Sequence, residues 1–413
     1  MALEPNSFYM HKNLFSVCLL LLTTITLRAQ ITGTIIGKTN AATVKSINAV
    51  FKDADQQYLN LGTLIKPKQF PKAYFPQNDS LSTSNSGWWC SGFYPGTLLY
   101  LYEQTKDPAL LKAADQKLQE LKVEEFNTST HDLGFMMYCS FGNAYRLNPT
   151  PAYKEILINS AKSLCKRFDP KVGLIKSWNS GNANDYTVII DNMMNLELLF
   201  WATKVTKDSS YYKIAVTHAD NTMKNHFRPD YSSYHVVVYD AQSGAVKQKK
   251  TAQGYADASA WARGQAWGLY GYTLMYRETK DRKYLEQAQH ISQFILNNPN
   301  LPKDKIPYWD FNAPNIPDAF RDASAAAIMA SAWLELSGYV NKKEGIEYTN
   351  TAKHILNNLS SPEYLAKPGT NGGFILKHSV GHLPAKSEID VAISYADYYY
   401  IEALARLKQS VTK

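Results

Sequence analysis

The stretch 188–202, VIIDNMMNLELLFWA, places one aspartate at the start of an otherwise almost wholly apolar helix. An amphipathic surface helix would show an apolar stripe and a charged face, so this composition predicts a buried helix. Asp191 and Asn195 are four residues apart and would share a face of it. A carboxyl group in apolar surroundings has a raised pKa, which suits a general acid. The alternative is a structural Asp that accepts hydrogen bonds from amides at the helix start.

A second aspartate precedes another apolar stretch in the same way. Asp132 is followed by LGFMMYCSFG, as Asp191 is followed by NMMNLELLFW. If the two helices are neighbours, their carboxyl groups would face each other across a cavity. One could then act as an acid while the other stays ionised, an arrangement that glycosidases use.

Candidate ligand-binding side chains stand near the starts of other apolar stretches. Arg263 offers a planar guanidinium that can bind a carboxylate through two hydrogen bonds. Trp89, Trp261 and Trp267 offer flat faces that suit sugar rings, and the chain is rich in Tyr (28) and Trp (8). Each residue also has an ordinary explanation in core packing or a local ion pair. Together they predict a glycosidase that acts on an acidic sugar.

Helical hairpins with a shared turn are the elements that must position these residues. YEQTKDPALLKAA at 102–114 resembles ATKVTKDSSYYKIA at 202–215 and YRETKDRKYLEQA at 276–288, and two looser copies occur. Such internal repetition indicates a repeated structural unit. We predict twelve helices, at 44–60, 91–105, 108–122, 132–147, 151–168, 190–206, 208–227, 258–280, 282–298, 320–338, 343–358 and 391–409.

Six hairpins that alternate an apolar with a more polar helix predict an all-α, double-ringed (α/α)6 barrel. The inner helices would be those that begin near 91, 132, 190, 258, 320 and 391. A solenoid of helical repeats is the rival fold, but the spacing between the turns is irregular and the extra residues precede the apolar helices. Ring closure would gather those variable loops around a cavity at one end. The segment 233–250 predicts an inserted β-hairpin.

The N-terminus predicts export. His11 and Lys12 precede an apolar run, and Arg28-Ala29-Gln30 follows it. This pattern indicates a signal peptide over residues 1–29, with an apolar core too short for a membrane span. Residues 30–413 would then form a single catalytic domain, located in the periplasm and free of the membrane. We expect a monomer or a weak oligomer.

Charge and cysteine content exclude several other functions. The net charge of +8 is spread along the chain without a long basic run, which argues against a nucleic-acid partner. Cys90, Cys139 and Cys165 show no CxxC pair and no metal-ligand spacing with His. We therefore expect three buried thiols, no metal and no cofactor.

Eight segments give the chain a resemblance to glycoside hydrolase family 88, the unsaturated glucuronyl hydrolases. They occur in order between Trp88 and Leu404, so that the resemblance covers nearly all of the chain after the signal peptide. The segments are GWWCSGFYPG (87–96), HDLGFMMYCSFG (131–142), VIIDNMMNLELLFWA (188–202), YHVVVYD (234–240), QGYADASAWARGQAWGLYGY (253–272), PYWDF (307–311), RDASAAAIMASAWLEL (321–336) and DYYYIEAL (397–404).

The resemblance implies an (α/α)6 barrel, with Asp191 as the catalytic acid and base and Asp132 as a second essential carboxylate. It also implies a substrate pocket formed by Trp89, Phe93, His235, Gln253, Arg263, Trp267 and His378. One departure is visible, since Tyr395-Ala396 stands where the resemblance leads us to expect Trp-Gly. That exchange affects the expected shape of the pocket wall.

The implied substrates are oligosaccharides released by polysaccharide lyases, which carry a 4,5-unsaturated uronic acid at the non-reducing end. The implied reaction is hydration of the C4=C5 double bond. Three alternatives remain open at this point: an unsaturated rhamnogalacturonyl hydrolase acting on pectin fragments, a polysaccharide lyase, and a binding protein for acidic sugars that has no activity.

Overall fold

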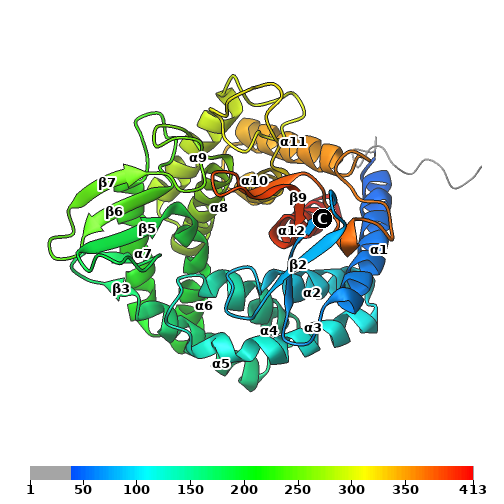
Figure 1. Cartoon of the computed structure of the whole chain (residues 1–413), viewed down its shortest axis with the longest axis horizontal. Helices are drawn as coiled ribbons and strands as arrows, with labels where there is room; N and C mark the ends of the chain where they lie inside the picture. Colours follow the sequence, from blue (N-terminus) through cyan, green and yellow to red (C-terminus); the bar gives the residue numbers. More distant parts are fainter. Residues whose placement is uncertain (1–38, 413) are drawn as a thin grey trace, which may run out of the picture.

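The computed structural model describes residues 39–412, and the predicted signal peptide at 1–29 lies outside this range. Helices follow one another around a closed ring in two layers (Figure 1). The inner layer consists of α2 (Phe93–Thr105), η2 (Gly134–Gly142) with α4 (Asn143–Leu147), η3 (Ile190–Asn195) with α6 (Leu196–Thr206), α8 (Ala262–Thr279), α10 (Ala323–Leu336) and α12 (Ser394–Thr412). The outer layer consists of α1 (Asn40–Leu64), α3 (Pro108–Leu121), α5 (Pro151–Cys165), α7 (Ser209–Asn225), α9 (Arg282–Asn297) and α11 (Lys342–Leu359).

This arrangement confirms the predicted (α/α)6 barrel. Each inner helix contacts the next one along the chain, and α12 closes the ring by packing between α10 and α2. The inner helices are buried almost all round, as in α10, whereas the outer helix α9 buries one face. A helix that is apolar all round, such as α10, must be covered on all sides. An amphipathic helix, such as α9, must have its polar face in water.

A repeated Thr-Lys-Asp turn joins three of the inner helices to their outer partners. Lys106, Lys207 and Lys280 end the inner helices in the left-handed conformation, with φ between 59° and 64°. The Asp that follows each of them caps the outer helix, as Asp107 does by accepting a hydrogen bond of 2.8 Å from the amide of Ala109. A left-handed residue stops one helix and the capping carboxylate starts the next. The shared turn chemistry therefore reflects real hairpins.

Two of the inner elements are not regular α-helices where we predicted them. The nine residues of η2 form a π-helix, and η3 is a 3₁₀-helix. The two touch closely, because a Cβ added to Gly134 would lie 2.4 Å from the Cα atom of Asn195. The side-chain oxygen of Asn195 accepts a hydrogen bond of 3.0 Å from the amide of Phe135. Such departures from the regular α-helix are frequent at functional sites. Here η2 follows Asp132 and η3 contains Asp191.

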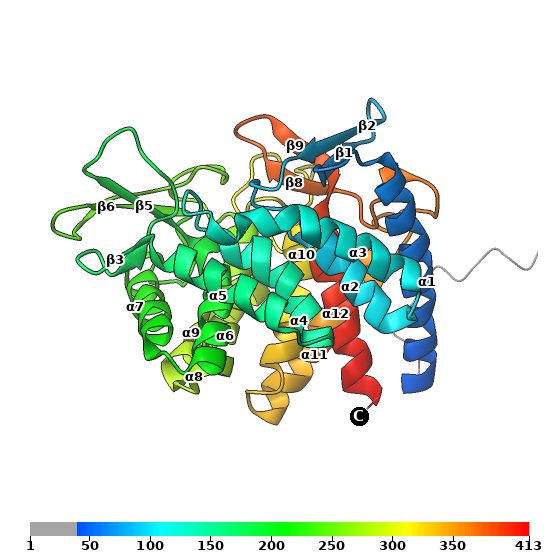
Figure 2. The same ribbon diagram turned by 90° about the horizontal axis from the view of Figure 1, so that it is seen from below.

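The strands cluster at the end of the barrel where the inner helices begin (Figure 2). The predicted hairpin is present as β6 (Val236–Asp240) and β7 (Val246–Lys250). We did not predict its third strand, β5 (Asp185–Ile189), or the sheet of order β2-β1-β9-β8. The remaining strands are β1 (Phe70–Phe75), β2 (Ser80–Ser84), β3 (Phe168–Asp169), β4 (Leu174–Ile175), β8 (Ser379–His382) and β9 (Ser387–Ile393), and short 3₁₀ turns are η1 (Lys122–Phe126) and η4 (Asn371–Gly373).

The four-stranded sheet joins segments from opposite ends of the chain, because Ala73 pairs with Ile393 and Tyr74 with Ala392. The predicted helix 391–409 therefore begins too early, since its first residues belong to β9. Within residues 39–412 no helix is long and apolar enough to cross a membrane. Cys90 is buried as predicted, whereas Cys139 and Cys165 are partly exposed.

Two buried histidines on α7 and at its end predict that acid destabilises the fold. Burial lowers the pKa of His218 and His226 to about 3. Below the ordinary value of 6.5 the unfolded chain binds protons that the folded chain rejects, so the free energy of unfolding falls as the pH falls from about 6.5 toward 3. The loss is about 1.4 kcal/mol per pH unit for each histidine.

Urea unfolding of the wild type and of His226→Phe between pH 7 and pH 4.5 measures this effect. Among residues 39–412 neither ring nitrogen of His226 has a hydrogen-bond partner, so the substitution breaks no hydrogen bond there. The variant should lose stability less steeply with falling pH, by about 1.4 kcal/mol per unit. Equal slopes for the two proteins would contradict the assignment.

Candidate functional site

A cavity of about 300 Å³ opens where the inner helices begin, under the strands β1, β8 and β9. Acidic, basic and aromatic side chains share its wall. The lining residues are Lys72, Trp88, Trp89, His131, Asp132, Phe135, Trp178, Ile189, Asp191, Gln253, Arg263, Gly381, His382, Ala385, Ser387, Glu388 and Tyr395. Five of the nine predicted site residues are among them: Trp89, Asp132, Asp191, Gln253 and Arg263.

Asp191 lies in the first turn of η3, at the end of strand β5, with a side chain that is 13% exposed. Burial raises the pKa of Asp191 to about 7, with a smaller contribution in the same direction from Asp132. The charge of Arg263, the backbone amide of Asp191 and the indole of Trp267 act in the opposite direction and lower the pKa of Asp191. The carboxyl group is therefore partly protonated near neutral pH, as a general acid requires.

Asp132 belongs to the loop that leads into η2. Its carboxylate accepts a hydrogen bond of 2.9 Å from the hydroxyl of Thr130, and Nε2 of His131 lies 3.2 Å from its other oxygen. The ring of His131 is 2% exposed, and burial lowers its pKa. Asp132 is thus held on two sides while it lines the same cavity as Asp191.

His235 lies behind Asp191 and does not line the cavity. Its Nδ1 accepts hydrogen bonds of 3.1 Å from the backbone amides of Ala252 and Gln253. Burial, followed by the charge of Arg263, lowers the pKa of His235 well below its usual value, so the ring is neutral. The proton of a neutral ring whose Nδ1 is an acceptor must be on Nε2, and Nε2 lies 3.6 Å from Asp191. His235 therefore directs an N–H toward the acid.

Arg263 lines the cavity, but its guanidinium is already engaged by the protein. Nη1 donates a hydrogen bond of 3.0 Å to Asp322, and Nη2 donates one of 2.6 Å to the carbonyl of Gly381. The group also lies 4.4 Å from the ring centre of Trp261. The predicted two-point contact with a ligand carboxylate would have to compete with these bonds. In this structure Arg263 holds strand β8 in place and contributes positive charge near Asp191.

The aromatic wall explains the unexpected Tyr395. Its ring lies 4.8 Å from that of Trp89, tilted by 41°, and 5.3 Å from the guanidinium of Arg263. Phe93 packs beneath Trp89 at 5.7 Å and is fully buried, so it supports the wall without reaching the cavity. Trp267 is also fully buried and packs on Phe135 at 5.0 Å.

Gln253 and His378 differ in their placement. The side-chain amide of Gln253 donates a hydrogen bond of 3.0 Å to the carbonyl of Gly381 while it lines the cavity. His378 lies outside the lining residues, with Nδ1 at 2.6 Å from Asp390. Asn195, which we predicted on the same helix face as Asp191, instead accepts a hydrogen bond from the amide of Phe135 within the core.

Several residues of the cavity wall are not among the nine predicted site residues. Trp178 stands 5.7 Å from His235 and is 37% exposed, in a segment without helical periodicity. Lys72 of β1 pairs with Glu388 of β9 at 3.1 Å, a contact between residues more than 300 positions apart. His131 could have been found from the sequence, because it directly precedes Asp132. No group of three or more potential metal ligands occurs within residues 39–412.

Comparison with known proteins identifies the family. The model of glycosyl hydrolase family 88 matches residues 67–300. The unsaturated glucuronyl hydrolase of Formosa agariphila is 50% identical over 327 residues, which are 79% of this chain and 81% of the relative. The unsaturated chondroitin disaccharide hydrolase of Streptococcus pyogenes is 32% identical, over 82% of this chain and 86% of the relative.

Solved structures agree with this result. The crystal structure of an unsaturated glucuronyl hydrolase specific for heparin superposes with a TM-score of 0.86 at 49% identity, covering 89% of this chain and 98% of that one. The enzyme of Bacillus sp. GL1 superposes with a TM-score of 0.81 at 29% identity, covering 88% and 98%. Together with a buried acid on an inner helix of an (α/α)6 barrel, these matches show that the chain belongs to glycoside hydrolase family 88, the family of the unsaturated glucuronyl hydrolases.

Proposed function

We propose that this enzyme removes the 4,5-unsaturated uronic acid from the non-reducing end of oligosaccharides produced by glycosaminoglycan lyases. The observation that carries the proposal is the buried carboxyl of Asp191, whose pKa is raised to about 7 in a cavity that also holds Asp132. An enol ether is hydrated by protonation of carbon, which needs an acid that keeps its proton near neutral pH.

In the proposed mechanism Asp191 donates its proton to C4 of the unsaturated ring, and positive charge develops at C5. Asp132 stabilises that charge and holds ring hydroxyls. Asp191, now ionised, takes a proton from a water molecule whose oxygen bonds to C5. The resulting hemiketal opens to a ketone at C5, the hemiacetal left at C1 releases the aglycone, and no covalent bond to the enzyme forms.

The neutral ring of His235 has a defined part in this cycle. Its Nε2 lies 3.6 Å from Asp191, beyond hydrogen-bond distance, and a closer approach would let it donate to the carboxylate that forms after proton transfer to C4. Trp89 and Trp178 would face sugar rings from the wall, and Gln253 would contact their polar groups. The negative charge of the substrate carboxylate would be met by the positive charges of Lys72 and Arg263.

Identity favours heparin-derived substrates. The relative whose crystal structure is described as specific for heparin is 49% identical, whereas the relatives described as chondroitin disaccharide hydrolases are 31–33% identical. We therefore propose that unsaturated heparin disaccharides are hydrated faster than those from chondroitin, hyaluronan or pectin.

Asp191→Asn tests the acid. The amide cannot donate a proton to carbon, so the loss of alkene absorbance from unsaturated heparin disaccharides should slow by at least about a hundredfold. Asp185→Asn is the matched control, because Asp185 lies on β5 outside the cavity and pairs with Lys247 at 2.5 Å. Near-normal turnover by Asp191→Asn would refute the role of Asp191. A rise in absorbance on intact polymer would instead indicate a lyase.

The pH dependence of kcat/KM provides a second test. The reaction begins with the protonated form of Asp191, whose pKa is about 7. Activity should therefore be retained below pH 7 and fall about tenfold per pH unit above it. Circular dichroism at each pH separates this loss from unfolding. A rate that stays constant from pH 6 to pH 9 would contradict the assignment.

We also propose that the enzyme works in the periplasm after removal of residues 1–29. Expression of the whole sequence in a Gram-negative host, followed by osmotic shock, should release a protein whose first residue is Gln30. A variant with Leu19→Arg and Leu21→Arg places charges in the apolar run and should stay in the cytosol as the full-length chain. Equal release of both proteins would argue against the signal peptide.

A further inference from the structure

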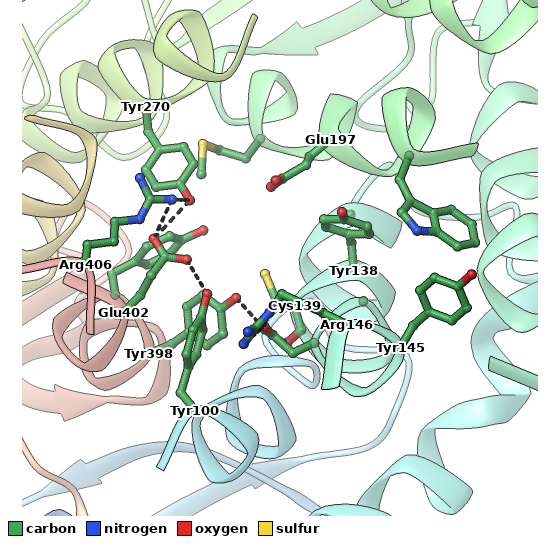
Figure 3. A pocket seen from close by; sticks show the side chains of 16 residues that line it. Tyr100, Tyr138, Cys139, Tyr145, Arg146, Glu197, Tyr270, Tyr398, Glu402 and Arg406 are labelled. Carbon is green, nitrogen blue, oxygen red and sulfur yellow. Dashed lines mark hydrogen bonds and ion pairs between the residues drawn. The ribbon is translucent and has the colours of Figure 1, made fainter. Parts of the chain in front are cut away.

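A second cavity of about 330 Å³ lies inside the barrel, on the side toward the ends of the inner helices. Figure 3 shows the side chains that line it. We call it the lower cavity. An aromatic layer separates it from the catalytic cavity. Phe135 lines the catalytic cavity and packs on Trp267, and Trp267 packs at 5.4 Å on Tyr399, which lines the lower cavity.

The lower cavity reaches the surface at the end of the barrel opposite the strands. A hollow of about 400 Å³, whose wall includes Gln104 and Lys408, shares four residues with it: Tyr100, Arg146, Glu402 and Arg406. A small molecule could therefore enter without passing through the catalytic cavity.

One side of the lower cavity is saturated by contacts within the protein. Glu402 accepts hydrogen bonds from the hydroxyls of Tyr100 at 3.1 Å and Tyr270 at 2.9 Å. Arg406 lies 3.4 Å from the same carboxylate and donates to the hydroxyl of Tyr270 at 2.8 Å. These bonds tie α2, α8 and α12 together, so this side needs no ligand.

The opposite side carries polar groups that the protein does not use. Among residues 39–412 no hydrogen bond involves the hydroxyls of Tyr138 and Tyr145 or the indole nitrogen of Trp201, although all three side chains line the lower cavity. Tyr145 packs edge-on against Trp201 at 5.3 Å, and Tyr138 lies 6.5 Å from it. Glu197 extends into the space between the two sides (Figure 3) and contacts Arg277 through one carboxylate oxygen only.

The charged groups around the lower cavity form a connected network. Arg146 contacts Glu103 through hydrogen bonds of 2.6 and 2.8 Å, whereas Arg277 and Arg406 are shared among Glu197, Glu335 and Glu402. Burial raises the pKa of Glu197, which reduces the excess of negative charge in this network. The cationic groups of the wall are thus all engaged by carboxylates, which disfavours an anionic ligand. Flat aromatic faces beside unused hydroxyl, indole and carboxylate groups match the apolar faces and hydroxyls of a pyranose ring, and the volume is at the lower end for ligand sites.

We propose that the lower cavity is a second binding site, separate from the catalytic site, for a neutral saccharide of one or two pyranose rings. Tyr138, Tyr145 and Glu197 provide hydrogen bonds to its hydroxyls, and Trp201 contacts a face of the ring.

Isothermal titration calorimetry of the whole exported chain with N-acetylglucosamine and with glucose tests the site. A ligand of this size should bind with a dissociation constant of about 1 mM. Tyr138→Phe and Tyr145→Phe should each weaken binding by about fivefold, the scale of one hydrogen bond. Because neither hydroxyl forms a hydrogen bond within the described part of the chain, both variants should fold and keep the wild-type rate on unsaturated disaccharides.

Tyr212→Phe is the matched control, because Tyr212 is exposed on the outer helix α7 and should leave binding unchanged. Asp191→Asn enzyme saturated with unsaturated disaccharide should bind the neutral sugar with the same affinity as the free enzyme. The proposal is overturned if neither sugar binds saturably, if both Tyr→Phe variants bind as the wild type does, or if the disaccharide competes. Tighter binding of a cationic amine such as choline would overturn the ligand class.

Discussion

The burial of one carboxyl group governs the organisation of this enzyme. Asp191 loses water on folding, which raises its pKa to about 7, and the nearby positive charge of Arg263 acts in the opposite direction. Burial disfavours the charged form of a carboxyl group, so the proton is retained at a higher pH. Asp191 is buried because it lies between strand β5 and the inner helix that follows it.

Arg263 and His235 show how distant segments are joined around that acid. Arg263 links α8 to Asp322 before α10 and to the carbonyl of Gly381 on β8. His235 uses Nδ1 to bind the loop at 252–253, which leaves Nε2–H for Asp191. In both cases bonds made behind the cavity fix the group, namely the guanidinium of Arg263 at the cavity wall and the ring of His235 behind Asp191, as in other catalytic sites whose supporting contacts fix the reacting groups.

The barrel has two ends with different chemistry. The strands gather at one end (Figure 2). There Lys72 of β1, Gly381 of β8 and Glu388 of β9 line the catalytic cavity. Toward the other end, ion pairs and tyrosine hydrogen bonds join the inner helices around the lower cavity (Figure 3), which reaches the surface there. The π-helix η2 borders both cavities, since Phe135 lines one and Tyr138 the other.

The sequence by itself determined the hairpins, their order and the two carboxylates. Helix periodicity and the Thr-Lys-Asp turns are local signals, so the (α/α)6 barrel and the places of Asp132 and Asp191 could be predicted. The sheet that joins β1 to β9 could not, because its strand pairs lie more than 300 residues apart. For the same reason the tertiary structure alone decided that Arg263 is bound by Asp322 and Gly381, that Tyr395 completes the wall with Trp89, and that Phe93 and His378 stay outside it. Hydrogen bonds and stacking between distant segments depend on how the ring closes, and no local pattern records them.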